Sequence, residues 1–215
     1  MSMITTAPAS APASSEHRPA PLYRMPHGVV DTARGTWAMG LFIATEAMLF
    51  LMLFFSYYYM GHAAPVWPPE PPKMRFALIM LAVLVSSSVV LRIGENASKR
   101  HEFGRARAAV TGTLVLGVAF IVLQVLEYAD HLTHLRPTTD AYGSIFYTIT
   151  SIHGAHVVLG LLMLSYVMVL PVEHMGGAGK PPHHTLKNAS MYWHFVDVVW
   201  ILIVSLLYVL PNVNR

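Results

Sequence analysis

The chain of 215 residues contains no cysteine and few charged residues. The absence of cysteine excludes disulfide bonds, thiolate metal sites and cysteine nucleophiles. Asp, Glu, Lys and Arg make up only 12% of the chain, against roughly 25% in soluble domains. Because 54% of the residues are hydrophobic and stand in long uninterrupted runs, the composition predicts an integral membrane protein and gives no sign of nucleic-acid binding.

The first 34 residues also lack the basic start and apolar core of a secretory signal peptide. They are rich in Ala, Pro and Ser, a composition that buries too little apolar surface to fold alone. We therefore predict a disordered or extended N-terminal tail over residues 1–34 and a single all-α transmembrane domain over residues 35–215.

Five apolar segments within that domain are suited to crossing a bilayer as helices, although the second is short. They lie at about residues 35–60, 76–91, 108–132, 143–170 and 189–210. The proline-rich loop at residues 65–72 separates the first two segments because such a run cannot be helical. The sequence thus predicts a bundle of five transmembrane helices.

Lysine and arginine are unequally divided between the two sides of this bundle. Ten lie in the tail, in the connector at residues 92–107 or in the loop at residues 173–187, whereas four lie on the other side: Lys73, Arg75, Arg136 and Arg215. Loops rich in Lys and Arg remain in the cytoplasm. This pattern predicts a cytoplasmic N-terminus and a C-terminus on the outer, periplasmic side.

Six ionisable side chains in the predicted spans are the candidate site residues: Glu46, Glu127, His153, His156, His194 and Asp197. A charged group at membrane depth costs roughly 2.5–3.5 kcal/mol on translocon scales, so each should face protein or water and have a partner. His153 and His156 could be two ligands of a metal site, but the Glu-x-x-His pairs of di-metal bundles are absent. Hydrogen bonds that join helices are the favoured alternative, and we predict no metal site.

Glu46 stands apart because it lies near the middle of the first predicted span. A carboxyl group at that depth is neutral unless it is paired. The residues leave two interpretations open. Glu46 is either a protonated structural group bonded to a histidine or a carbonyl, or a group with a proton-linked function.

Small and aromatic residues give further expectations about packing. The hydroxyls of Ser86-Ser87-Ser88 can bond carbonyls of the preceding helical turn. Gly112 and Gly117 permit close helix approach. The tryptophans are expected mostly in interfacial belts; they are Trp37, Trp67, Trp193 and Trp200.

Six motifs, in order and together covering about residues 37–210, resemble subunit III of the haem–copper respiratory oxidases. They are Phe42-Ile43-Ala44-Thr45-Glu46-Ala47-Met48-Leu49-Phe50, Trp67-Pro68-Pro69, Leu123-Gln124-Val125-Leu126-Glu127-Tyr128, Tyr142-Gly143-Ser144, His153-Gly154-Ala155-His156-Val157, and the nine residues from Tyr192 to Trp200. The chain lacks the first two helices of the seven-helix form of that family. It therefore resembles the short five-helix bacterial form.

The resemblance implies a non-catalytic subunit of a complex that reduces oxygen and translocates protons, located in the bacterial plasma membrane. No cofactor is expected in this chain; haem and copper would belong to subunit I, copper to subunit II, and both subunits would be partners. Bound phospholipid and support of proton uptake are also implied. Glu46 matches the family's carbodiimide-reactive carboxylate, and the other candidate site residues match buried polar helix or lipid contacts.

Other functions remain as alternatives. Subunit III of a quinol oxidase and the subunit-III-like companion of a nitric oxide reductase share the helical plan, but Trp67-Pro68-Pro69 favours a cytochrome c oxidase. A separate proton-coupled transporter that uses Glu46 is a third alternative. Transporters of that kind usually contain inverted repeats and broken helices, and no such repeat is visible in the sequence.

Overall fold

The computed structural model describes residues 27–64, 67, 74–131, 141–169 and 184–213. Their helices are α1 (His27–Ala63), α2 (Met74–Lys99), α3 (Phe103–His131), α4 (Ala141–Val169) and α5 (His184–Ile203), which continues through the π-helical segment η2 (Val204–Val209) into α6 (Leu210–Val213). Five of these helical stretches are long and apolar enough to cross a membrane. The predicted all-α architecture with five spans is confirmed, and the chain is a multi-pass membrane protein.

The helices extend beyond the predicted apolar segments. α1 begins at His27, so residues 27–34 of the predicted tail are helical, whereas residues 1–26 lie outside the described part. α2 ends at Lys99 and α3 begins at Phe103, so most of the predicted connector at residues 92–107 is also helical. Hydropathy marks the stretch that can lie in lipid, while the helical backbone continues into the polar flanks.

A short turn joins α2 to α3. His101 has a φ of 60°, the left-handed conformation that commonly ends helices. The N–H of Glu102 donates to the carbonyl of Ala97 at 2.9 Å, and that of His101 donates to the carbonyl of Ser98 at 3.0 Å. These two bonds form a Schellman motif that satisfies the last carbonyls of α2. The turn makes α2 and α3 an antiparallel hairpin.

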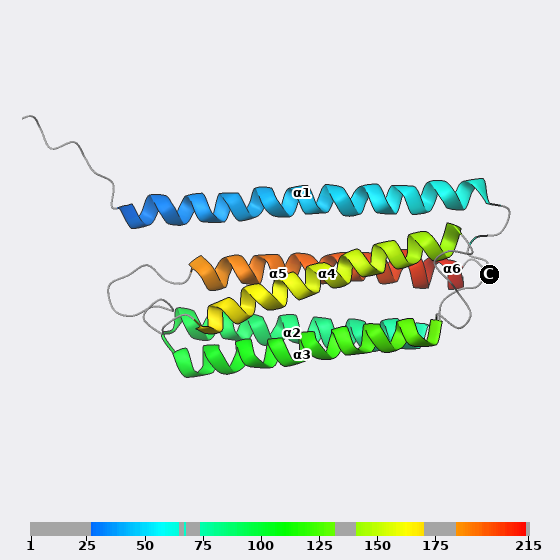
Figure 1. Cartoon of the computed structure of the whole chain (residues 1–215). Helices are drawn as coiled ribbons and strands as arrows, with labels where there is room; N and C mark the ends of the chain where they lie inside the picture. Colours follow the sequence, from blue (N-terminus) through cyan, green and yellow to red (C-terminus); the bar gives the residue numbers. More distant parts are fainter. Residues whose placement is uncertain (1–26, 65–66, 68–73, 132–140, 170–183, 214–215) are drawn as a thin grey trace, which may run out of the picture.

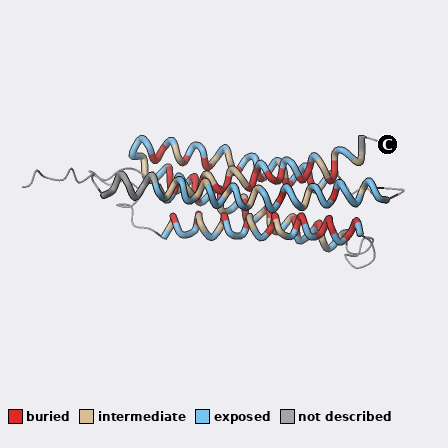
Figure 2. The backbone as a smooth tube through the Cα atoms, turned by 90° about the horizontal axis from the view of Figure 1, so that it is seen from above, coloured by how far each residue is buried: buried red, intermediate tan, exposed pale blue. Residues whose placement is uncertain are grey.

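The helices form three layers (Figure 1). α4 and α5 lie in the middle, α1 lies on one side of them, and the α2–α3 hairpin lies on the other side. The start of α1 and the end of α6 lie at opposite ends of the bundle. α5 therefore has neighbours on several faces, whereas α1 packs on the bundle with one face only. Figure 2 shows α1 as a mostly exposed helix.

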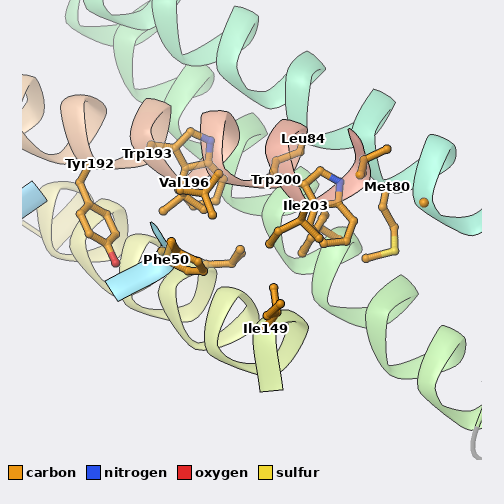
Figure 3. Packing of buried hydrophobic residues seen from close by; sticks show 14 of the residues in the cluster. Phe50, Met80, Leu84, Ile149, Tyr192, Trp193, Val196, Trp200 and Ile203 are labelled. Carbon is orange, nitrogen blue, oxygen red and sulfur yellow. The ribbon is translucent and has the colours of Figure 1, made fainter. Parts of the chain in front are cut away.

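Trp193 and Trp200 of α5 lie at the centre of the bundle, and both are fully buried (Figure 3). Gly117 of α3 and Gly160 of α4 make room for Trp193, because a Cβ at either position would lie 2.7 or 2.8 Å from its ring. The expectation of interfacial belts is wrong for these two tryptophans, since α5 occupies the middle layer. Trp37 on α1, by contrast, is 75% exposed.

The three adjacent serines of α2 divide between two kinds of hydrogen bond. Ser86 donates to the carbonyl of Ala82 at 2.7 Å, and Ser87 donates to that of Leu84 at 2.6 Å, as predicted. Ser87 also accepts a bond of 2.9 Å from the indole N–H of Trp193. Ser88 differs, because its hydroxyl pairs with a side chain of α5. The serine triplet thus fixes the register between α2 and α5.

Candidate functional site

Glu46 of α1 and His156 of α4 form a polar contact between side chains that joins α1 to the middle of the bundle. Glu46 Oε2 lies 2.9 Å from His156 Nε2, and the two side chains are 21% and 13% exposed. Nδ1 of the same imidazole lies 2.7 Å from the carbonyl of Ile152, one turn earlier in α4. The ring of Phe50 meets the imidazole edge to face at 5.0 Å, which leaves a largely apolar surrounding.

The contact with Ile152 determines which protonation states the pair can adopt. A carbonyl only accepts hydrogen bonds, so His156 Nδ1 must carry a proton and donate it. In a neutral imidazole Nε2 is then a bare acceptor, and the proton in the 2.9 Å contact belongs to a protonated Glu46. If Nε2 is protonated instead, an imidazolium faces a carboxylate. Both states have one proton between the two groups and no net charge, so proton transfer within the pair leaves its total charge unchanged.

His153 lies on α4 three residues before His156 but belongs to a different environment. Its side chain is fully buried, and its ring stacks on Trp200 with centroids 5.0 Å apart and an interplanar angle of 24°. Phe120 meets it edge to face at 5.7 Å. Neither ring nitrogen has a hydrogen-bond partner within the described part of the chain. The two histidines therefore do not form a shared site; His153 is part of the aromatic centre.

Glu127 of α3 is almost fully buried, and it accepts a hydrogen bond of 2.9 Å from the hydroxyl of Tyr208. Tyr208 lies in η2, where the N–H of Leu210 donates to the carbonyl of Ser205, five residues earlier. A π-helical turn rotates the following side chains relative to an α-helix and often marks a functional position. Here the π-helical segment contains the tyrosine that binds Glu127.

The neighbours of Glu127 in the same sequence motif form a different contact, between α3 and α4. Gln124 Nε2 donates to the carbonyl of Thr150 at 2.7 Å, and Tyr128 donates to the hydroxyl of Thr150 at the same distance. A Cβ at Gly154 would lie 2.6 Å from Gln124 Oε1, so the glycine lets the amide lie close to α4. The motif thus contributes hydrogen bonds between helices at three successive polar positions.

His194 and Asp197 lie where α5 meets α2. His194 Nδ1 is 2.8 Å from the hydroxyl of Ser88 and 3.9 Å from Asp197 Oδ2. The Asp197 side chain is 8% exposed, and neither of its oxygens has a hydrogen-bond partner among the residues that the structure describes. This corner of the bundle therefore combines an imidazole bonded to Ser88 with a buried carboxyl group that faces the same imidazole at 3.9 Å, too far for a hydrogen bond.

The six candidate residues are thus divided among separate helix contacts rather than gathered in one centre. Within the described residues no group of three His, Asp or Glu side chains has the geometry to hold a metal ion. Reasoning from the sequence missed Tyr208 and the pairing of Ser88 with His194. Glu127 lies near the C-terminal end of α3 and Tyr208 near the C-terminal end of the last span. In a bundle of alternating helices these two ends lie at the same depth, so the sequence contained a signal for this pair.

Comparison with known proteins gives a consistent result over almost the whole chain. Residues 24–211 match the family model described as cytochrome c oxidase subunit III. A protein named cytochrome c oxidase subunit 3 from Synechocystis is 35% identical over 173 residues, which cover 79% of this chain and 73% of the relative. Proteins of the same name from Thermostichus vulcanus and Bacillus subtilis are 33% and 32% identical and cover 80% and 84% of this chain, and 85% and 86% of their own lengths.

Proposed function

Because the chain belongs to the cytochrome c oxidase subunit III family, we propose that it acts as the non-catalytic subunit III of a haem–copper terminal oxidase. In this proposal subunit I binds haem and copper, subunit II binds copper, and both are partners of this chain. Among the described residues the candidate polar side chains are divided among separate helix contacts, and the chain has no cysteine to bind a metal; both observations fit a subunit whose partners carry the redox centres. The complex lies in the plasma membrane of a bacterium, with the N-terminus in the cytoplasm, as the distribution of Lys and Arg indicates.

The contact between Glu46 and His156 is the observation from which we infer how this subunit acts chemically. With one proton held in the 2.9 Å contact the pair is neutral overall, which avoids the cost of an isolated buried charge at membrane depth. When that proton passes on to another group, a second proton must replace it for the pair to become neutral again. We assign to this pair the support of proton uptake by the complex. The Glu46 side chain is 21% exposed, which is also consistent with reaction of its carboxyl group with a lipid-soluble carbodiimide.

Bound phospholipid is the second part of the proposal. The outer face of α1 supports it, because that face presents large apolar side chains along most of the helix. They include Trp37, Leu41, Met48, Met52 and Phe55, each more than half exposed. Acyl chains on this face would cover the helix that carries Glu46.

Purification of the native complex tests the assignment. An affinity tag on this chain should co-isolate subunits that contain haem, and the complex should consume oxygen with reduced cytochrome c. Isolation of this chain alone, without haem, would refute the role. Oxygen uptake with quinol but not cytochrome c would indicate a quinol oxidase, and nitric oxide turnover would indicate the reductase companion.

The proton-linked part has its own test. Glu46→Gln keeps a hydrogen-bonding group opposite His156 but removes the proton that the pair shares. We expect the variant complex to assemble and to bind haem normally, while its proton uptake during turnover slows severalfold or its activity decays sooner. Unchanged proton uptake and unchanged lifetime in turnover would remove Glu46 from this role but leave the subunit assignment intact.

A further inference from the structure

A cavity of about 470 Å³ lies between α1, α4 and α5. Figure 1 shows the start of α1, the end of α4 and the start of α5 at the same end of the bundle, and the distribution of Lys and Arg indicates that this end faces the cytoplasm. Met39 of α1 and Met163 of α4 form apolar parts of the lining, whereas Tyr166 of α4 and both Thr185 and Asn188 of α5 add polar groups. We call this space the α1–α4–α5 cavity.

The cavity opens at a depth where the membrane contains water. α5 begins at His184, so Thr185 lies in its first turn, and Tyr166 lies three residues before α4 ends at Val169. The headgroup layer is roughly 5–7 Å thick on each side of the hydrocarbon core, which corresponds to about four residues of a helix. Thr185 and Tyr166 therefore lie at headgroup depth, and Met163 lines the cavity about one helical turn deeper.

The same cavity lies on the cytoplasmic side of the pair formed by Glu46 and His156. Met39 precedes Glu46 by seven residues on α1, and Met163 follows His156 by seven residues on α4. Because α1 and α4 cross the bundle in opposite directions, both spacings lead about 10 Å from the pair towards the cytoplasmic end. The two helices that contribute the pair thus also line the cavity.

A layer of aromatic side chains separates the cavity from the pair. Phe42, one turn before Glu46, stacks on Tyr192 of α5 with ring centroids 6.0 Å apart. Tyr192 is fully buried, and its hydroxyl points away from α5 (Figure 3) and donates to the main-chain carbonyl of His156 at 3.4 Å. The barrier between the cavity and the pair is therefore thin, and it contains a hydroxyl group beside the histidine.

We propose that the α1–α4–α5 cavity holds water and supplies protons to the pair of Glu46 and His156 from the cytoplasmic side. When the pair has passed on its proton, a hydronium ion from this water gives one proton to the carboxylate and becomes water, so the pair is neutral again. The inference rests on the proposed function, because the pair needs a replacement proton only if it takes part in proton uptake. It adds the route by which that proton enters.

Single cysteines test whether the cavity is hydrated, because the chain has none of its own. Met39 lines the cavity, whereas Leu41, two residues further along α1, does not line it and is 68% exposed. A charged methanethiosulfonate reacts with thiolates, which form in water but not in hydrocarbon. In inside-out membrane vesicles that contain the assembled complex, we expect this reagent to modify Met39→Cys at least about tenfold faster than Leu41→Cys.

The same modification tests the supply of protons. The group attached to Met39→Cys fills the cavity of a complex that is already folded, so proton uptake during turnover should slow severalfold, as we expect for Glu46→Gln. In the double variant with Glu46→Gln, the modification should cause no further slowing. Leu41→Trp adds bulk to α1 outside the cavity and should leave proton uptake unchanged. Should Met39→Cys fail to assemble, Met163→Cys allows both measurements from the α4 side of the cavity.

The inference is wrong if Met39→Cys is no more reactive than Leu41→Cys, because the cavity is then dry or filled by acyl chains. It is also wrong if the modified Met39→Cys complex takes up protons at the full rate while Glu46→Gln is slow, because protons then reach the pair by another route. Full proton uptake in Glu46→Gln itself refutes the proton-linked role of the pair, and the inference with it. That failure is distinguished from the other two because it is seen without any change to the cavity.

Discussion

α1 and α5 are both apolar enough to span a membrane, yet they occupy opposite kinds of position. Their most apolar 18-residue stretches have mean hydropathies of 2.1 and 1.8, but only 6% of that stretch is buried in α1 against 56% in α5. α5 packs aromatic rings against glycines of two neighbours, while α1 contributes two fully or almost fully buried aromatic side chains, Phe50 and Tyr57, and the contact of Glu46 with His156. Hydropathy reports that a helix can lie in the membrane, and packing decides which helix the others surround.

Removal of the central tryptophan should give the largest difference between the two helices. Trp200→Ala leaves a cavity beside His153 and Phe120, and we expect it to destabilise the subunit by about 3 kcal/mol, since lost packing contacts remain costly even in a bilayer. Trp37→Ala on α1, where the side chain is 75% exposed, should change stability by less than about 0.5 kcal/mol. Thermal unfolding of the purified variants measures both. Similar losses would contradict the assignment of α5 as the central helix.

Adding a side chain at a glycine beside Trp193 of α5, and at another glycine on α1, compares the same two regions by overpacking. Gly160→Val would place atoms within 3 Å of the Trp193 ring and should cost about 2 kcal/mol through overpacking. A Cβ at Gly40 of α1 meets nothing within 4 Å, so Gly40→Val should be close to neutral. The yield of folded subunit and its unfolding temperature are the measurements. If Gly160→Val is tolerated, the helices can move apart at Trp193 without loss of stability, which would contradict this prediction.

Deletion of one hydroxyl should have a smaller effect. Tyr208→Phe removes the hydrogen bond that buried Glu127 accepts, which we expect to cost about 1 kcal/mol. Tyr59→Phe on α1 is the control, because that side chain is 68% exposed and should be neutral. Chemical denaturation of the two variants in detergent compares them. Equal stability of both would mean that the contact between η2 and α3 does not depend on this bond.

The smallest effect on stability is expected at the polar group of α1. Glu46→Gln keeps a hydrogen bond to His156 and should change stability by less than about 1 kcal/mol, the size typical of bonds between membrane helices. It should abolish labelling of this chain by a lipid-soluble carbodiimide, which needs a carboxyl group. Glu127→Gln is the control, because Glu127 is 1% exposed and should not contribute to labelling. Labelling of wild type and Glu46→Gln to the same extent would exclude Glu46 as the reactive group.

The parts of the fold that could be predicted are those that depend on local composition. Five apolar runs give five helices because a bilayer leaves a backbone little alternative. The candidate site residues could be found because each is ionisable within such a run. The turn at His101 could not be predicted, since the charged flanks of α2 and α3 resemble a loop, and neither could the burial of Trp193 and Trp200, because a tryptophan within a span is compatible with either a belt or a core.

Which polar residues pair with one another could not be predicted from the sequence, for a different reason. Glu46 and His156 are separated by 110 positions, and Ser88 and His194 by 106, so only the three-dimensional arrangement of the layers decides which groups meet. His153 and His156 show the same limit at short range. They are three residues apart on one helix, but the first faces Trp200 and the second faces Glu46, because α4 packs against both α1 and α5.

The packing of Trp193 against Gly117 and Gly160 affects the order in which the helices assemble during synthesis. Helices leave the ribosome in chain order, so α1 to α4 enter the membrane before the residue that joins α3, α4 and α2 has been synthesised. Until α5 arrives, the glycine surfaces of α3 and α4 and the hydroxyl of Ser87 lack the indole that they contact in the finished bundle. α2 and α3 can pack as a hairpin before α5 is made, but we expect α1 and α4 to settle against that hairpin only when α5 inserts among them.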